Sequence, residues 1–479
     1  MSDTTRRVMV IGAGPAGLAA AAAAADAGAE VVLVDEGERV GGQFWRHHPA
    51  LTDERLQHQR RRFADLRDRL RDVRVVSSAS VWRVDAGPPL RAHVLIGPAD
   101  AADRRAETID ADAVVVATGA HDRVLPVPGW TLPGVTSAGA AQALAKRDGL
   151  APGARTVVAG AGPFLLPVAQ SVALMGGQVA EVVEATSAGR MLRGWGARAW
   201  ELTAAIGKAG ELGSYLFSLA AHRTPYRFGS AVTRIHGDAG VEAVTVQRID
   251  ADWHPIAGTE RIVECDSVAL GHGFTPRLEA AIQFGCEIGS DRFVQVGDDQ
   301  STSVAGVYAA GEITGIGGAD AALAEGEIAG LAAARVPDTD RRWRAPLAAR
   351  RRMRAFAARL DVHRIGRGWT TWLEDDTIIC RCESVPKARL DEFSAASSRA
   401  MRLSTRAALG ACQGRTCGRS VEDVLGTSLG VDRRPVLSSV RIGELAALAG
   451  TDSGPSGPDD APAASAAPSA PTNRPSGGI

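Results

Sequence analysis

The chain has 479 residues, with 54 Lys and Arg against 55 Asp and Glu, which leaves a formal net charge of -1. A chain this close to neutral has no global field that would attract nucleic acid or an anionic membrane, so a small molecule or another protein is the expected partner. The length exceeds what one hydrophobic core usually holds and predicts two or three domains. Almost all of the positive charge is Arg, with Lys only at positions 146, 208 and 387, and we infer no function from that bias.

No uninterrupted apolar run is long enough to span a bilayer. The apolar stretch from Val8 to Ala25 is broken by glycines and a proline and lacks a small-residue cleavage pattern, so it does not fit a signal peptide. We therefore expect a cytoplasmic protein. In a reducing compartment its six cysteines are expected to be metal ligands or buried thiols rather than disulfides.

A glycine turn near the N-terminus lies between a strand signal, Val8 to Ile11, and an alanine-rich helix. The turn consists of Gly12, Ala13, Gly14, Pro15, Ala16 and Gly17. Its first glycine permits a tight turn, its second lets backbone amides approach a pyrophosphate, and its third lets helix pack on strand. Asp35 lies at the end of the next strand, where its carboxylate is placed to accept hydrogen bonds from ribose hydroxyls, and Glu36 is adjacent. The spacing predicts a dinucleotide site rather than a turn that serves packing alone.

A second unit of the same kind begins with the strand signal Thr156 to Ala159 and the glycines Gly160 and Gly162. Glu184 ends its second strand and would favour NAD over NADP if a nicotinamide cofactor bound there. The third glycine position is occupied by Leu165. The sequence leaves three alternatives open for this site: it turns over NADH, it holds another adenine nucleotide, or it is vestigial.

Further segments strengthen the prediction of a flavin site. They are Gly41, Gly42 and Gln43, then Ala117, Thr118 and Gly119, and finally Ala309, Ala310, Gly311 and Glu312. With them the sequence resembles the two-dinucleotide-binding-domain flavoproteins related to glutathione and thioredoxin reductases, which implies FAD at the first turn. In that family the last motif usually ends in Asp and contacts the flavin ribityl chain, and the following helix points its N-terminus at the isoalloxazine ring. Glu312 replaces that Asp here.

The redox cysteine pair of the disulfide reductases is missing from both of its usual places. Phe44 to Pro49 follow the GG motif, and no cysteine lies between Gly160 and Glu184, so a dithiol relay is excluded. His47 and His48 lie where the first pair would be. We expect solvent exposure or a phosphate contact for them rather than acid or base chemistry near the flavin.

Four cysteines near the C-terminus form two close pairs, Cys380 with Cys382 and Cys412 with Cys417. Four thiolates suit either a 2Fe-2S cluster or zinc. Glycines that free backbone amides and arginines that offset cluster charge favour the 2Fe-2S cluster. These are Gly410, Gly414 and Gly418, with Arg381, Arg415 and Arg419. Cys265 and Cys286 have no such neighbours and are expected to be buried.

The four-cysteine segment looks like the bacterioferritin-associated-ferredoxin type of 2Fe-2S domain. Together with the FAD motifs it resembles the large (alpha) subunit of heteromeric amino-acid dehydrogenases, as in D-hydroxyproline dehydrogenase, opine dehydrogenases and bacterial hydrogen cyanide synthase. That resemblance implies a beta subunit with its own flavin that oxidises a small amino or imino acid, a small third subunit, and electron transfer through this chain. Two alternatives stay open: a self-sufficient NADH-dependent oxidoreductase, and a structural subunit with vestigial nucleotide sites.

The predicted fold is α/β, a two-dinucleotide-binding-domain (Rossmann-like) flavoprotein with a small helical 2Fe-2S domain at the C-terminus. Strand signals from Val73 to Val116 predict a β-meander on the first domain, and those from Val268 to Thr275 and from Val304 to Gly311 are expected to return to it. The predicted domains are 6–150 (FAD-binding, first part), 151–265 (inserted second domain), 266–336 (FAD-binding, return), 337–374 (Arg-rich connecting helix), 375–450 (2Fe-2S) and 451–479 (disordered tail).

Overall fold

The computed structural model describes residues 5–47, 56–196, 206–430 and 435–449. The chain divides into two compact units, Met1–Ser439 and Val440–Ile479. The described part of the second unit holds one helix, α13 (Ile442–Ala449). Within the described ranges, no helix combines the length and apolarity needed to cross a membrane. The predicted tail, 451–479, lies outside the described residues.

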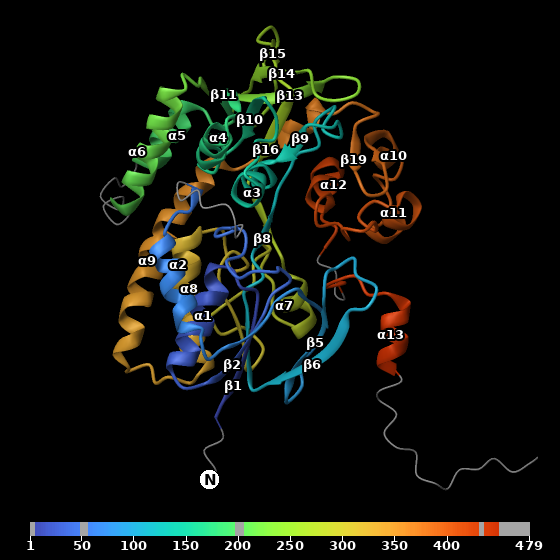
Figure 1. Ribbon diagram of the computed structural model, residues 1–479. Helices are drawn as coiled ribbons and strands as arrows, with labels where there is room; N and C mark the ends of the chain where they lie inside the picture. Colours follow the sequence, from blue (N-terminus) through green and yellow to red (C-terminus); the bar gives the residue numbers. More distant parts are fainter. Residues whose placement is uncertain (1–4, 48–55, 197–205, 431–434, 450–479) are drawn as a thin grey trace, which may run out of the picture. The chain divides into compact units, whose positions relative to one another are not determined.

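A five-stranded parallel sheet carries the first nucleotide-binding unit (Figure 1), in the order β18-β7-β1-β2-β3. Its strands are β1 (Arg7–Ile11), β2 (Glu30–Val34), β3 (Arg74–Val76), β7 (Ala113–Val116) and β18 (Val307–Ala309). The four residues of β7 are all buried, as expected for a strand whose two faces are covered. The helices α1 (Pro15–Asp26) and α8 (Ala319–Ala333) lie side by side next to this sheet.

The backbones of α1 and α8 approach each other closely because small residues face each other. A Cβ atom at Gly326 would lie 2.0 Å from the carbonyl oxygen of Ala16, and one at Gly330 would lie 2.3 Å from that of Ala20. The alanine-rich composition of both helices therefore reflects close packing.

The second sheet has the order β12-β11-β10-β16-β9. Its strands are β9 (Val135–Ser137), β10 (Arg155–Gly160), β11 (Gln178–Glu184), β12 (Tyr226–Phe228) and β16 (Ser267–Gly271). The sequence-based expectation that the segment from Val268 returns to the first sheet is wrong, because β16 pairs in parallel with β10 along its whole length. The return to the first sheet is made by β18, which pairs with β7.

Helices of the second nucleotide-binding unit follow its strands. They are α3 (Ala138–Ala143), continued by the π-helical turn η2 (Leu144–Asp148), then α4 (Leu165–Leu174), α5 (Ala188–Gly196) and α6 (Ile206–Ala221). A short antiparallel pair, β8 (Ala120–Asp122) with β17 (Phe274–Pro276), connects the two nucleotide-binding units. Both β9 and α3 precede residue 151, so the second sheet and its helices start earlier in the chain than the predicted boundary.

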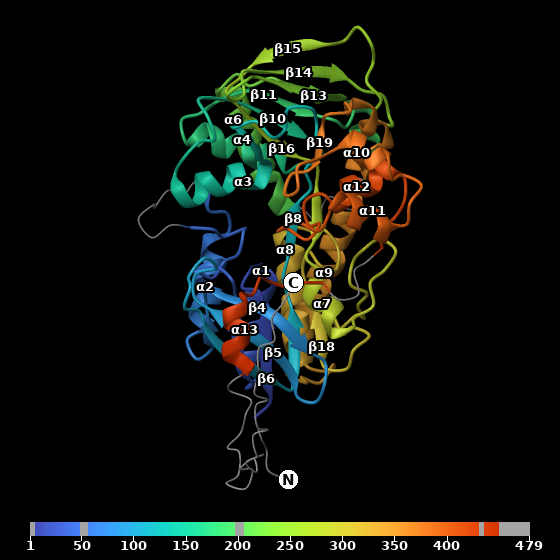
Figure 2. The same ribbon diagram turned by 90° about the vertical axis from the view of Figure 1, so that its right-hand side faces the viewer.

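Two antiparallel three-stranded sheets complete the strands of the nucleotide-binding units. The predicted meander is present as β4 (Ala79–Asp85), β5 (Leu90–Ile96) and β6 (Arg105–Ala111). The other sheet consists of β13 (Ser230–His236), β14 (Ala243–Arg248) and β15 (Arg261–Glu264), which Figure 2 shows side by side beyond the second sheet. The predicted α/β class with two Rossmann-like units is thereby confirmed.

Apart from the 14-residue helix α9, the remaining elements have ten residues or fewer. They are α2 (Arg60–Arg69), α7 (Glu279–Phe284), η4 (Arg341–Trp343), α9 (Arg344–Ala357), η5 (Ala358–His363), η6 (Arg367–Trp372), β19 (Ile378–Cys380), β20 (Val385–Pro386), α10 (Lys387–Asp391), α11 (Ser398–Thr405) and α12 (Gly418–Leu425). The Arg-rich connection is thus one α-helix flanked by 3-10 turns. The four cysteines lie around β19 and before α12, in a part of the first unit that packs on the second sheet.

We predict that Gly326→Ala lowers the free energy of unfolding by about 2–3 kcal/mol, because the added methyl group meets the Ala16 carbonyl and forces α1 and α8 apart. The matched control is Gly213→Ala in α6, whose Cβ would meet nothing within 4 Å. That control should leave stability unchanged or raise it by up to about 1 kcal/mol. Denaturant unfolding of both variants checks this, and equal stabilities would contradict the packing argument.

Candidate functional site: the glycine turns, their carboxylates and the four cysteines

A cleft of about 2550 Å³ runs along the carboxyl ends of the first sheet and onto the second nucleotide-binding unit. It is several times larger than a typical small-ligand pocket of about 300–1,000 Å³. Many of the residues predicted from the sequence line it. They include Gly12, Gly14, Pro15, Asp35, Glu36, Gly42, Gln43, Ala117, Thr118, Gly119 and Glu312. The fold therefore brings the scattered flavin motifs to one cavity.

The first glycine turn has the geometry that its spacing predicts. Gly12 has a φ of +103°, and a Cβ there would lie 2.4 Å from the carbonyl oxygen of Ala117 at the end of β7. A Cβ at Gly17 would lie 1.7 Å from the carbonyl oxygen of Gly12. A Cβ at Gly14 would meet nothing within 4 Å, so this position is open toward the cleft. The turn therefore fits an extended pyrophosphate at the N-terminus of α1.

Asp35 and Glu36 have different surroundings. The Asp35 carboxylate accepts hydrogen bonds from the backbone N–H of Ala13, at 2.5 Å, and of Gly37, at 2.8 Å, so it stabilises the glycine turn itself. Burial raises the pKa of Asp35 above its usual value. Glu36 is held by Arg277, which donates to it with both terminal nitrogens and, against the effect of burial, keeps the pKa of Glu36 low. Arg277 was not identified from the sequence.

The GG motif packs directly against the first turn. Gly41 donates its backbone N–H to the carbonyl of Ala13 at 2.8 Å. A Cβ at Gly42 would lie 2.8 Å from the Cα of Gly14. A side chain at Gly42 would push the two segments apart, whereas one at Gly41, which has a φ of +123°, would meet the carbonyl oxygen of Trp45 at 2.8 Å.

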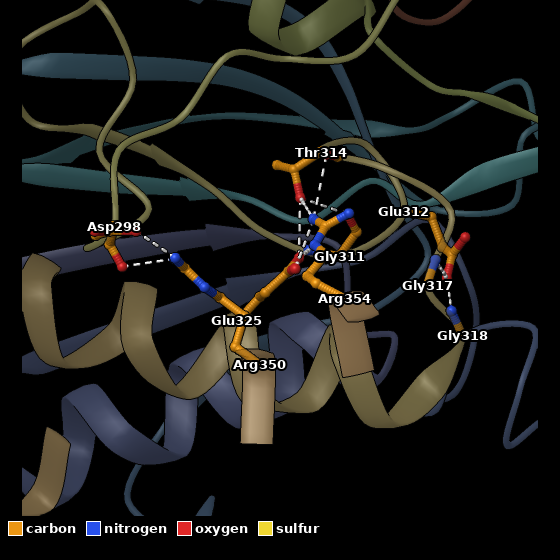
Figure 3. Close-up of polar contacts among 9 residues, drawn as sticks. All are labelled: Asp298, Gly311, Glu312, Thr314, Gly317, Gly318, Glu325, Arg350 and Arg354. Atoms are coloured by element: carbon orange, nitrogen blue, oxygen red, sulfur yellow. Dashed lines mark hydrogen bonds and ion pairs between the residues drawn. The ribbon is translucent and has the colours of Figure 1, made fainter. Parts of the chain in front are cut away.

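Glu312 interacts with the start of α8 (Figure 3). Its Oε1 accepts hydrogen bonds from the backbone N–H of Gly318, at 2.7 Å, and of Gly317, at 3.4 Å, and burial raises the pKa of Glu312 to about 7. A carboxylate in this place is favoured by the partial positive charge of a helix N-terminus. The predicted contact with the ribityl chain stays a prediction, and it would require the carboxylate to leave these amides or to share them.

A buried ion pair supports this motif from behind, and no pattern in the sequence indicated it. Glu325 is 1% exposed and accepts from the backbone N–H of Gly311 at 3.0 Å. Arg354 of α9 reaches Glu325 at 2.6 Å and donates to the Thr314 hydroxyl at 2.8 Å. Arg350, one turn earlier, pairs instead with the exposed Asp298 (Figure 3). The Arg-rich connection thus holds a buried carboxylate next to the flavin motif.

In the second nucleotide-binding unit, the carboxylate of Glu184, which was expected to favour NAD, is hydrogen-bonded to other groups of the protein. Glu184 is fully buried and accepts from the backbone N–H of Gly162, at 3.0 Å, and of Thr186, at 2.9 Å. The hydroxyl of Tyr226 lies 3.3 Å away, and Nδ1 of His363 lies 3.4 Å away. His363 belongs to the Arg-rich connection, so that segment reaches this site as well.

The structure gathers all four cysteines of the C-terminal motif. The thiol of Cys417 interacts with those of Cys380 and Cys412, and the thiol of Cys382 interacts with that of Cys412. Cys380 and Cys417 are buried, whereas Cys382 is exposed. Across the described ranges of the chain, no three His, Cys, Asp or Glu side chains are arranged as a finished metal site. The thiols are therefore brought together, but not spaced as ligands around an ion.

Backbone amides surround these thiols. Those of Ala408 and Glu383 interact with the sulfur of Cys380, and that of Thr416 interacts with the sulfur of Cys412. A Cβ at Gly410 would lie 2.4 Å from the Cβ of Cys382, so only glycine fits there. Such amide donors and close backbone approach suit a group of thiolates that carries negative charge.

The three arginines expected to offset cluster charge are engaged elsewhere. Arg415 pairs with Glu279 at 2.5 Å and Arg419 pairs with Glu422 at 3.7 Å. The guanidinium carbon of Arg381 lies 5.8 Å from the ring centre of Trp130. Cys265 and Cys286 are buried, as predicted.

The family model for pyridine nucleotide-disulphide oxidoreductases matches residues 6–326, more than half of the chain. The chain belongs to the pyridine nucleotide-disulphide oxidoreductase family. Membership makes it an oxidoreductase and implies binding of FAD and of a nicotinamide nucleotide.

Several relatives match this oxidoreductase over most of its length. Hydrogen cyanide synthase subunit HcnB of Pseudomonas aeruginosa is 33% identical over 442 residues, which cover 86% of this chain and 90% of that protein. An opine oxidase subunit of Agrobacterium tumefaciens is 31% identical over 479 residues, covering 93% and 92%. L-proline dehydrogenase from P. horikoshii shares the fold, with a TM-score of 0.65 at 21% identity, covering 92% of this chain and 79% of that chain. The predicted resemblance to the hydrogen cyanide synthase and opine enzymes is confirmed.

This oxidoreductase has no cysteine pair at the place after its GG motif. His47 lines the cleft and its Nδ1 lies 2.8 Å from the Trp45 carbonyl, whereas His48 lies outside the described residues. Lys146 of η2 fills part of this region and donates to the carbonyl of Phe44 at 2.9 Å. No motif in the sequence had marked Lys146 as a site residue.

We predict that Arg354→Met costs about 3–5 kcal/mol of stability, because it leaves the buried Glu325 carboxylate unpaired. Arg350→Met is the matched control on the same helix face and should cost about 1 kcal/mol or less, since its partner Asp298 is exposed. The double variant Arg354→Met with Glu325→Gln should recover most of the loss. Denaturant unfolding of the three variants measures this, and equal losses for the two arginines would contradict it.

Proposed function

We propose that this chain is the electron-transferring FAD and 2Fe-2S subunit of a heteromeric dehydrogenase, in which a partner subunit with its own flavin oxidises a small amino or imino acid. One observation carries the proposal. Four thiols form one group of interacting side chains, and the loop that supplies two of them is ion-paired through Arg415 to Glu279 at the cleft that holds the FAD motifs. The two features that electron transfer needs are thus adjacent in one chain.

The residues of this chain would bind and position the two groups. The glycine turn and the N-terminus of α1 would hold the FAD pyrophosphate, and Asp35 would hold the ribose. Cys380, Cys382, Cys412 and Cys417 would ligate the cluster, with backbone amides donating to their sulfurs. When bound, FAD accepts two electrons and a 2Fe-2S cluster passes them one at a time.

The names of the relatives support the partner and the substrate class. The hydrogen cyanide synthase, opine oxidase and sarcosine oxidase relatives are all named as subunits. The alpha subunit of sarcosine oxidase from Corynebacterium sp. is 29% identical, over 71% of this chain and 34% of that protein. Opines and sarcosine are N-substituted amino acids, so a C–N bond of that kind is the proposed point of oxidation. The substrate pocket is assigned to the partner, and a small third subunit completes the proposed complex.

A self-sufficient NADH-dependent oxidoreductase is the second candidate, because the family binds nicotinamide nucleotides. The contacts of Glu184 speak against it. Asp35 also accepts from two backbone amides, but it lines the cleft, whereas Glu184 is fully buried and in addition faces Tyr226 and His363. Glu184 therefore has little capacity left for ribose hydroxyls. We therefore assign the supply of electrons to the partner subunit.

We predict that NADH and NADPH do not bleach the flavin of the purified chain under anaerobic conditions within minutes, whereas dithionite reduces both the flavin and the cluster. Absorbance reports the flavin, and electron paramagnetic resonance reports the reduced cluster. Prompt stoichiometric reduction by NADH would instead establish the second candidate.

We predict that Cys382→Ser abolishes the cluster signal and lowers the iron content to background, while FAD stays bound at the wild-type ratio. The matched control is Cys286→Ser, a buried cysteine whose Sγ lies 3.4 Å from the Thr302 hydroxyl, far from the thiol group in sequence. That control should keep both signals. Unchanged iron and acid-labile sulfide in the Cys382 variant would refute the assignment of this ligand.

A further inference from the structure

Lys146 is a buried lysine at the edge of the cleft. The residue is 5% exposed, and its Nζ donates to the carbonyl of Phe44 at 2.9 Å and lies 5.4 Å from the Phe44 ring centre. Among the described residues no carboxylate forms an ion pair with it, and burial alone lowers the pKa of Lys146 to about 8. Burying an ammonium group in this way is costly unless an anion compensates it.

The setting of Lys146 is unusual for this chain. The whole sequence has 54 Lys and Arg, of which only three are Lys. Lys387 is partly exposed and paired with Asp391 at 2.6 Å. Lys146 instead lies in the π-helical turn η2, a type of irregularity that is frequent at functional sites. A compact ammonium at a buried position is therefore a specific feature in a chain whose usual cation is Arg.

Lys146 is one of the residues that line the flavin cleft. Lys146 lines that cleft together with Phe44, which follows the GG motif, and with Gly318, which precedes α8. Two other cations of the cleft, Arg277 and Arg147, are paired with Glu36 and Asp148. Arg39, which is exposed, and Arg46, which is half-buried, also line the cleft, so burial is what distinguishes Lys146. Lys146 thus brings a positive charge, unpaired within the described part of the chain, to the place where the dithiol of the disulfide reductases would act.

We propose that Lys146 is the counter-cation of the reduced flavin. Two electrons and one proton convert the oxidised isoalloxazine ring into an anion that carries one additional negative charge. In the proposed complex the electrons originate from the amino or imino acid on the partner. The ammonium stays protonated, forms no bond to the ring and stabilises the anion electrostatically, which makes the flavin easier to reduce. This inference rests on the flavin part of the proposed function and needs neither the cluster nor the partner.

The test compares variants that separate charge from hydrogen bonding. Lys146→Gln keeps an N–H donor for the Phe44 carbonyl but removes the charge, and Lys146→Arg keeps the charge. Arg147→Met is the matched control, because it removes an exposed, already paired charge one residue away. Midpoint potentials of the FAD-loaded proteins are measured with xanthine and xanthine oxidase as reductant. The dissociation constant of the flavin–sulfite adduct is measured separately, because that adduct also places negative charge on the ring.

Lys146→Gln should disfavour flavin reduction at least tenfold, which corresponds to about 30 mV for a two-electron couple, and should weaken sulfite binding at least tenfold. Lys146→Arg and Arg147→Met should each stay within about threefold of wild type. Unchanged potential and sulfite affinity in FAD-loaded Lys146→Gln would overturn the proposal. A loss confined to FAD affinity or to thermal stability would also overturn it, since it would assign Lys146 to the pyrophosphate or to the fold.

Wild-type protein gives an independent measurement in case Lys146→Gln does not fold. Its reduced flavin should keep the anionic absorbance spectrum to about one pH unit below the pKa of free reduced flavin. Protonation of the reduced flavin at the free-flavin pKa would overturn the proposal. Purified wild-type chain that contains no reducible flavin would instead refute the proposed function, so the two failures are distinguishable.

Discussion

The close approach of α1 to its neighbours is the constraint on which the nucleotide site depends. Gly17 lets the helix pack against the Gly12 carbonyl, and Gly326 lets α8 approach the Ala16 carbonyl. A Cβ at Gly311 would lie 2.9 Å from the Cβ of Ala16, so the third motif packs on the same turn. Because the two helix contacts are against backbone carbonyls, no side-chain rotation can relieve a larger residue there. Three segments that are distant in sequence are thereby held around one helix N-terminus, where a pyrophosphate is favoured.

The Arg-rich connection joins the two nucleotide-binding units through their buried carboxylates. Arg354 pairs with Glu325 beside the first site, and His363 faces Glu184 at the second. Each of these carboxylates also accepts a backbone N–H of a glycine-containing motif. The connection is therefore part of both sites rather than a solvent-facing spacer. At least one of its arginines, Arg354, forms a buried ion pair, and neither the composition nor the helical spacing of the segment indicated this contact.

Charge is arranged unevenly around the cleft. Near the ribose position, Glu36 and Arg277 neutralise each other, and Arg415 of the cysteine loop is tied to Glu279. Lys146 donates to a backbone carbonyl, and Glu312 accepts from the amides that precede α8. Lys146 is a buried ammonium, and burial raises the pKa of Glu312 to about 7. The charges around the cleft thus fit the flavin chemistry expected of the family.

The local sequence determined the strands, the glycine turns and the occurrence of the four C-terminal cysteines as two pairs close in sequence, because each depends on spacing within a few residues. It predicted the α/β class, the meander and the residues of the first turn. Only the tertiary structure showed that β16 lies in the second sheet and that protein groups are hydrogen-bonded to the Glu184 carboxylate. It also showed that Arg354 pairs with Glu325 and that Lys146 donates to the Phe44 carbonyl. These features depend on contacts between residues about 20 to 180 positions apart. Long-range pairing of buried charges follows from packing, which no local pattern encodes.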